Sequence, residues 1–364
     1  MEDDRTVKGP ESGSKDAPVT DPAQGQPAIA GAGGTGAVAA SAGDSSRGRA
    51  FGPTAANIAG KYGLLITFLL TIVVFCLLKP KTFATWDNAE AILTLAAPSM
   101  IMAIGLTVVL VMQDFDLSFG AMIGLAGGAV TTFIVSDGMG WGLAILMVLA
   151  IGVLVGVLNG FMVAYLGGNS FIITLAMGTV LTGVEFALTG QDTVFTGLPL
   201  DFLNIAGGEF LGLSHQIWIA LVVILVGWAL MDRTELGRYM YAIGGNEEAA
   251  RLSGIRVKPY RVIGFIAVGL AASIVGIMLI SLTGSYSPNG GATYLLPAFA
   301  AAFLGAAVFR PGEFNIPGTV VGVLFLGVIQ TGLVMLNFES YVINLVQGGI
   351  LIAAVLISRL GQRA

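Results

Sequence analysis

The chain has 364 residues, of which 55% are hydrophobic and 11% are charged. An average soluble domain carries about 25% charged residues, so this composition excludes an ordinary soluble enzyme and indicates a protein of the lipid bilayer. The formal net charge of -5 does not predict a nucleic-acid partner, because many of the acidic residues lie between Glu2 and Asp44, outside the apolar part of the chain.

Single copies of two residue types restrict the chemistry of the chain. Cys76 is the only cysteine and His215 the only histidine, so a disulfide within the chain is excluded and a zinc site or catalytic triad would rest on one candidate side chain. The sequence has no G-x-x-x-x-G-K-[ST] phosphate loop. We therefore expect no catalytic residue, no metal and no cofactor, and any ATP used must be bound by another protein.

Residues 1–57 differ in composition from the rest of the chain. They are rich in Ala, Gly, Ser, Pro and Asp and contain few large apolar side chains, so they cannot bury enough surface to offset their ordering entropy. They also lack the basic start and apolar run of a secretory signal. This composition predicts a disordered cytoplasmic tail before a transmembrane domain over residues 58–364.

The transmembrane domain is divided into apolar blocks of the length that a bilayer requires, about 20 helical residues each. The apolar residues lie on all sides of each predicted helix instead of forming one stripe. This distribution is expected where lipid and neighbouring helices are both apolar surroundings. We predict an all-α polytopic membrane protein with about ten transmembrane helices in one bundle. The predicted spans are 61–79, 89–112, 117–135, 140–165, 170–189, 216–231, 261–282, 294–310, 317–337 and 340–358, and the tight connections near 113–116 and 311–316 are typical of broken or re-entrant helices.

Basic residues predict the orientation of these spans. The loop over 232–260 and the C-terminal segment hold most of the Lys and Arg near the membrane, whereas the loops over 190–215 and 283–293 have none. Positive charge favours the cytoplasmic side, and an even number of spans places both termini there. Lys79 and Lys81 are the exception to this distribution.

Several polar residues interrupt the apolar blocks. Glu185 lies near one end of the span 170–189; burying a carboxylate at a helix centre costs about 2.5 to 3.5 kcal/mol on insertion scales, so such groups usually face a polar cavity. The alternatives are that Glu185 reaches the outer interface, or is protonated and hydrogen-bonded. Amides form a second group, which either joins helices or lines a pathway: Asn159, Gln330, Asn337, Asn344 and Gln347.

The stretch "QDFDLSFG", residues 113–120, joins two spans and contains two carboxylates. Asp116 is suited to capping the free N–H groups of the next helix, whereas capping does not explain Asp114, and Ser118 is a further pathway candidate.

A sequence echo, in which similar residues recur about 199 positions later, begins in this region. Pro98 and Asp114 match Pro297 and Glu313. Gly120 and Gly124 match Gly318 and Gly322 in the same way. The echo predicts a parallel duplication in which two proline-bearing helices each end in an acidic turn on the cytoplasmic side.

Within the basic loop, "GGNEEAARLSGI" contains the signals of a short helix with defined ends. Asn246 is a favourable N-cap, and Glu247 and Glu248 lie where the helix dipole favours anions. Gly254 followed by Ile255 is typical of a left-handed C-terminal cap with an apolar contact. A helix of about two turns is marginal alone, so we expect its rigidity to serve docking on a protein or on the membrane surface.

The segment "LGRYMYAIGGNEEAARLSGIRV" resembles the signature loop of the permease subunits of bacterial sugar ABC importers of the ribose, xylose and galactose group. "DFDLSFGA" and "GTVVGVLFLGVIQTGLVML" are similar to two further segments of that family, and the resemblance extends over residues 60–360. It implies a cytoplasmic (inner) membrane location, a second permease copy, an extracytoplasmic sugar-binding protein and separate ATP-binding cassette subunits. It also implies an ATPase-coupling surface formed by Gly244, Gly245, Asn246, Glu247, Ala249, Arg251, Leu252, Ser253 and Gly254.

Two departures from the family pattern qualify this resemblance. Asp114 stands where the family usually has Gly, and residues 304–319 introduce Arg310, Glu313 and Pro317. Both departures are consistent with a subgroup that transports another small carbohydrate, either a monosaccharide or a polyol. The candidate pathway residues are Asp114, Asp116, Ser118, Asn159, Glu185 and Gln330.

Two alternatives belong to other functional classes. A self-sufficient secondary transporter or channel would use Glu185 or Asp114 as an ion site, and it would move its substrate without an ATPase. An intramembrane enzyme is disfavoured because the single histidine lies in a predicted outer loop.

Overall fold

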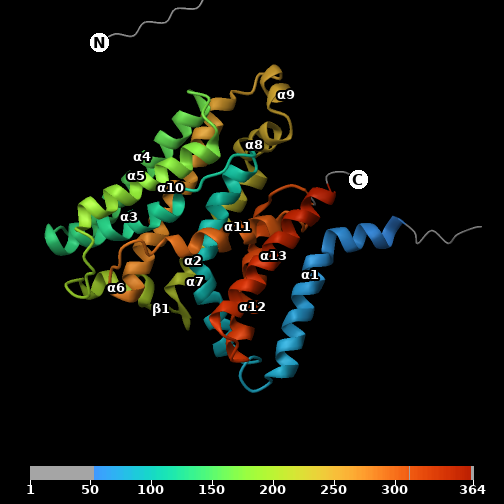
Figure 1. Cartoon of the computed structure of the whole chain (residues 1–364), viewed down its shortest axis with the longest axis horizontal. Coiled ribbons are helices and arrows are strands. Elements are labelled where there is room, and N and C mark those ends of the chain that lie inside the picture. Colours follow the sequence, from blue (N-terminus) through green and yellow to red (C-terminus); the bar gives the residue numbers. More distant parts are fainter. Residues whose placement is uncertain (1–52, 311, 362–364) are drawn as a thin grey trace, which may run out of the picture. The chain divides into compact units, whose positions relative to one another are not determined.

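The computed structural model describes residues 53–310 and 312–361 (Figure 1). The predicted tail therefore lies outside the described residues up to position 52, and its last residues belong to the first helix. The long helices are α1 (Pro53–Leu78), α2 (Trp86–Leu110), α3 (Phe119–Thr131), α4 (Trp141–Ala164), α5 (Ser170–Thr189), α7 (His215–Trp228), α10 (Val257–Thr283), α12 (Ile316–Met335) and α13 (Ser340–Gly361).

Shorter elements connect the long helices. The π-helical turns η1 (Thr132–Ser136) and η2 (Ala229–Arg233) extend α3 and α7, and a 3-10 turn η3 (Ala292–Tyr294) precedes α11. The others are α6 (Leu200–Gly207), the antiparallel pair β1 (Glu209–Phe210) and β2 (Leu213–Ser214), α8 (Glu235–Gly245), α9 (Glu247–Leu252) and α11 (Leu295–Gly305). Each of the ten predicted spans overlaps a helix, and the all-α prediction is confirmed.

Within the described residues, seven helices are long and apolar enough to cross a membrane. The predicted span 294–310 was too long: α11 has 11 residues, and a rise of 1.5 Å per residue gives it about 16 Å of a hydrocarbon core about 30 Å thick. The helix ends at Gly305 because the chain turns back there. Phe309 adopts a left-handed φ of 60°, and the Asn315 amide donates to the Gly305 and Val308 carbonyl oxygens at 3.3 and 3.1 Å.

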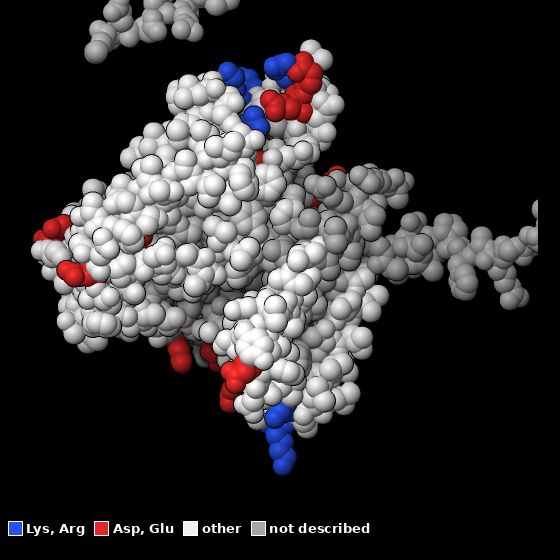
Figure 2. All heavy atoms as spheres, in the orientation of Figure 1, with Lys and Arg blue, Asp and Glu red and all other residues white. Residues whose placement is uncertain are grey.

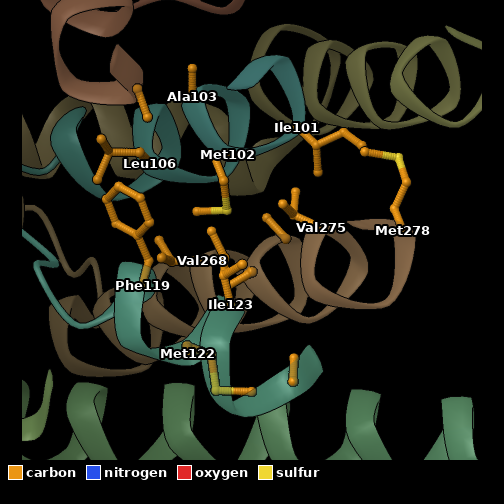
Figure 3. Packing of buried hydrophobic residues seen from close by; sticks show 14 of the residues in the cluster. Ile101, Met102, Ala103, Leu106, Phe119, Met122, Ile123, Val268, Val275 and Met278 are labelled. Atoms are coloured by element: carbon orange, nitrogen blue, oxygen red, sulfur yellow. The ribbon is translucent and has the colours of Figure 1, made fainter. Parts of the chain in front are cut away.

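The core lies between α2, α3 and α10 (Figure 3). In α2, 78% of the most apolar window is buried inside the protein, against 28% in α4 and 17% in α5, so α2 is central and the other two present most of their surface to the outside of the bundle. α10 packs closely on α4 through glycines: a Cβ on Gly269 would lie 2.2 Å from the Gly152 carbonyl oxygen. This contact confirms that small residues allow close helix approach.

The connections that follow α2 and α11 lie at the same end of the bundle. The first connection (residues 111–118) contacts Gly244 and Arg261, and the second connection (residues 306–315) contacts Asp232 and Tyr241. The two proline-bearing helices of the sequence echo thus end on one side, as predicted.

Most of the basic residues visible in Figure 2 lie at this same end of the bundle, whereas acidic residues also lie elsewhere on this face. On the face shown in Figure 2, Lys and Arg gather where α8 and α9 lie in Figure 1, while a further basic group lies near the turn joining α1 to α2.

Candidate functional site

The candidate coupling helix, α9, is fixed at both ends as its sequence predicted. The Asn246 side-chain oxygen accepts a hydrogen bond from the Ala249 N–H at 2.9 Å, and Gly254 adopts a left-handed φ of 88°. The Ile255 N–H then donates to the Ala250 carbonyl oxygen at 3.1 Å, which closes the C-terminal cap. A helix of six residues is therefore stabilised by its caps and its contacts rather than by its length.

Only one face of α9 rests on the rest of the protein. Ala250 is buried, whereas the Leu252 side chain is 81% exposed beside Arg251. An ion pair between Arg251 and Glu248 lies on the same exposed surface. The predicted coupling residues that are exposed are Gly245, Asn246, Glu247, Ala249, Arg251, Leu252, Ser253 and Gly254.

Gly244 differs from these residues because it packs on the end of α2. A Cβ at this position would lie 1.8 Å from the Val111 carbonyl oxygen, so only glycine allows the contact. Gln113, which adopts a left-handed φ of 62°, donates from its side-chain amide to the Gly244 carbonyl oxygen at 2.6 Å. The end of α8 and the first connection are thus in direct contact.

Asp114 forms a buried ion pair with Arg261, the fifth residue of α10. The Arg261 Nε donates to Asp114 Oδ2 at 2.7 Å and its Nη2 to Oδ1 at 3.0 Å. The Asp114 side chain is 3% exposed and that of Arg261 22%. This bidentate geometry fixes the planes of the Asp114 carboxylate and the Arg261 guanidinium relative to each other. The paired positive charge offsets the cost of burying the carboxylate.

Asp116, Ser118 and Asn159 form one buried cluster, although the last residue lies on α4. Asp116 Oδ1 accepts from the Ser118 N–H at 2.8 Å and from its hydroxyl at 2.6 Å. The Asn159 amide donates to Ser118 Oγ at 2.9 Å and to Asp116 Oδ2 at 3.5 Å. Ser118 is the N-cap of α3, so Asp116 stabilises the start of this helix through the N-cap residue and not as the cap itself.

Two hydroxyls of α5 hold the backbone between these carboxylates. The Phe115 N–H donates to Ser170 Oγ at 3.2 Å, and the Leu117 N–H donates to Thr174 Oγ1 at 3.0 Å. The first connection therefore contacts α4, α5, α8 and α10, which makes it a junction between distant parts of the sequence.

Glu185 is fully buried and does not reach the outer interface. Its Oε1 accepts from the Tyr286 hydroxyl at 2.8 Å and from the Asn289 N–H at 2.9 Å. Its Oε2 lies against Gly124, where a Cβ would approach to 2.6 Å, and has no hydrogen-bond partner. These hydrogen bonds join α5 to the segment between α10 and α11. Because Glu185 is buried within the protein, the alternative that it reaches the outer interface is wrong.

Gln330 lies in a different environment from the buried carboxylates. It lines a cavity of about 280 Å³ between α2, α11, α12 and α13, and the Gln347 amide donates to its side-chain oxygen at 3.3 Å. Further polar residues line the same cavity, one from α12 and three from other elements: Thr331, Ser99, Thr293 and Tyr294.

The second connection is organised by Asn315, which sequence reasoning missed. Its side-chain oxygen accepts from the Gly318 N–H at 2.8 Å and caps α12, where Pro317 occupies the first turn. Its amide also donates to the Glu313 carbonyl oxygen at 3.0 Å. An Asn immediately before a proline-containing helix start was the signal available in the sequence.

Contacts with α8 and η2 hold the second connection from outside. Arg310 pairs with Asp232 at 2.7 Å, and the Tyr241 hydroxyl donates to the Phe314 carbonyl oxygen at 3.1 Å. Burial, with the nearby Asp232 charge, raises the pKa of Tyr241 to about 12. The phenol therefore remains a hydrogen-bond donor at neutral pH.

Comparison with known proteins gives consistent relatives. The family model described as "Branched-chain amino acid transport system / permease component" matches residues 88–355. The ribose import permease protein of Escherichia coli strain K12 is 36% identical over 301 residues, 82% of this chain and 93% of its own length. The D-allose transport system permease protein of the same strain is 30% identical over 300 residues, 82% of this chain and 92% of its own.

A third relative carries the transporter class in its name. The L-arabinose ABC transporter permease protein of Azospirillum brasilense is 31% identical over 304 residues, which cover 82% of this chain and 88% of its own length. No solved structure matches. The family match spans most of the described bundle, including both connections and α9. The chain therefore belongs to this family of polytopic ABC transporter permease components.

Proposed function

We propose that this permease translocates a small carbohydrate, a monosaccharide or a polyol, across the cytoplasmic membrane, and that ATP hydrolysis on separate subunits drives the transport. The names of the three relatives specify ribose, D-allose and L-arabinose, which are all monosaccharides. The observation that carries the proposal is α9, whose exposed face is free for a partner, while the preceding end of α8 contacts the first connection.

The ATP-binding cassette subunits dock on α9 and the end of α8, which places this end of the bundle and both chain termini in the cytoplasm. The basic residues gathered there support this orientation (Figure 2). A remote ATPase shifts a permease between conformations only through contacts that differ between its own states. A second permease copy and an extracytoplasmic sugar-binding protein complete the transporter.

The cavity that contains Gln330 is the best candidate for part of the translocation pathway. Exposed amides are costly against hydrocarbon, and the Gln330 side chain is exposed on the described surface of a long apolar helix. Water, cargo or a second permease copy must therefore cover it. Amide and hydroxyl groups suit the hydroxyls of a carbohydrate, since each can donate or accept hydrogen bonds.

The other five candidate pathway residues support the walls of the pathway in this proposal. Asp114 binds Arg261, and the cluster of Asp116, Ser118 and Asn159 joins the first connection to α4. Glu185 fastens the segment before α11. Their hydrogen bonds, with those of the adjacent backbone, join the first connection to α4, α5 and α10, and α10 packs on α2, which lines the cavity.

Reconstitution in proteoliposomes with the ATPase and binding protein tests this function. Uptake of radiolabelled monosaccharides should require ATP inside the vesicles with the ATPase subunits, and Leu252→Asp or Arg251→Glu should abolish ATP-dependent uptake while membrane insertion is retained. Uptake by the permease alone, driven by an ion gradient, would instead identify a secondary transporter. Normal uptake by both variants would contradict docking on α9.

A further inference from the structure

Arg261 contacts two segments besides its own helix, and one of them, the first connection, lies 147 residues away in the sequence. Its guanidinium holds Asp114 of the first connection with two hydrogen bonds, at 2.7 and 3.0 Å. Its remaining Nη1 lies 3.6 Å from Oε2 of Glu247, the first residue of α9. Arg261 itself belongs to the start of α10, a central helix of the core. One side chain thus links α9, α10 and the connection between α2 and α3.

The two ion pairs of Arg261 differ in strength. The Asp114 side chain is 3% exposed and its pair is bidentate, so solvent screens it little. The Glu247 side chain is 51% exposed and its contact is longer, which leaves it weakened by water and salt. The guanidinium is therefore firmly attached to the first connection and loosely attached to α9.

The first connection is suited to pass a displacement onward. Two residues after Asp114, Asp116 begins the cluster that reaches Asn159 on α4. The backbone N–H groups of Phe115 and Leu117 donate to Ser170 and Thr174 on α5. A change at Asp114 therefore reaches the starts of α3 and α5 and the C-terminal half of α4 through hydrogen bonds of 2.6 to 3.5 Å.

We propose that Arg261 is a positioning residue that transmits movement of α9 to the first connection, through its simultaneous contacts with Glu247 and Asp114. This inference rests on the proposed function, because it takes α9 as the element that the ATPase moves. It also gives Asp114, the departure from the family pattern at this position, a partner and a role.

The test compares uptake per ATP hydrolysed in the full reconstituted transporter. Arg261→Lys keeps the charge but removes the planar fork, and this ratio should fall roughly 2- to 30-fold, the range that corresponds to coupling energies of residues between two sites. Glu247→Gln should lower the ratio less, because it removes only the exposed contact. The matched control is Arg238→Lys on α8, where the exposed pair with Glu235 is 3.6 Å long, and its ratio should stay at the wild-type value.

Assembly is measured in the same preparations by co-purification of the ATPase subunits. Retained assembly with a reduced ratio for Arg261→Lys supports the inference. A wild-type ratio for this variant overturns it, and so does loss of co-purification, since Arg261 would then serve assembly instead of transmission. If the wild-type complex itself transports without ATP, the proposed function fails and this inference fails with it, whereas a wild-type ratio for Arg261→Lys in an ATP-dependent complex overturns this inference alone.

Discussion

The two connections of the sequence echo occupy equivalent places after proline-bearing helices, yet different chemistry holds them. The first connection uses a buried ion pair, with the Asp114 side chain 3% exposed, and a carboxylate-centred cluster around Asp116. The second uses neutral groups, chiefly the Asn315 amide, and an ion pair in which the Arg310 side chain is 46% exposed. A shared backbone plan therefore does not imply a shared distribution of charge.

This difference indicates which connection is more sensitive to mutation. Buried charges and their partners are expensive to separate, whereas an amide that pairs with carbonyl groups is replaced at a lower cost. The first connection also contacts the end of α8 directly through Gly244, so a defect there reaches the proposed docking surface on α8 and α9. We expect larger effects in the first connection than in the second.

The largest effect is expected for Asp116→Ala. It leaves the Ser118 N–H and hydroxyl without their buried acceptor, which should lower the free energy of unfolding by about 2 to 4 kcal/mol. Thermal unfolding in detergent measures the change. Asp116→Asn retains one acceptor oxygen and should lose less. Equal losses in the two variants would show that the carboxylate charge, and not hydrogen-bond acceptance, determines the stability of the cluster.

An intermediate effect is expected for Asn315→Ala in the second connection. Loss of the α12 cap and of the donor to the Gly305 and Val308 carbonyl oxygens should cost about 1 to 2 kcal/mol. Asn315→Asp keeps the cap oxygen and removes only the donor, so it separates the two contributions in the same unfolding assay. A loss greater than that of Asp116→Ala would reverse the proposed order of the two connections.

The smallest effect is expected for Tyr241→Phe, which removes one hydrogen bond and should cost about 1 kcal/mol. The pKa of this phenol is about 12 against an ordinary value of 10.0. The unfolded chain therefore loses the proton first, and stability should fall as the pH rises from 10 to about 12. Unfolding measured across this range should show less alkaline loss in Tyr241→Phe than in the wild type.

The control for the pH experiment is Tyr239→Phe on the same helix, because that side chain packs on Tyr260 instead of the second connection. Its alkaline profile should follow that of the wild type. If Tyr241→Phe gave the same profile, burial of this phenol would contribute nothing to the alkaline loss.

Much of the fold was predictable because the length of an apolar segment and the capping residues at its ends are local features of the sequence. The ten apolar blocks overlap with helices, and Asn246 and Gly254 delimit α9 as their backbone preferences require. The exception, α11, ends early because of contacts that Asn315 makes from ten residues away. The apolar sequence does not predict such a turn, because every residue up to Val308 is compatible with a helix.

The candidate site likewise has features that the sequence predicts and features that it does not. The sequence by itself determined that Asp114, Asp116 and Glu185 are unusual, because charge is costly in an apolar segment. Only the tertiary structure decided their partners: Arg261 lies 147 residues from Asp114, and Tyr286 lies 101 residues from Glu185. The physical reason is that helices apolar on all sides carry no stripe that specifies a neighbour, so packing of the whole bundle is what brings each charge to its partner.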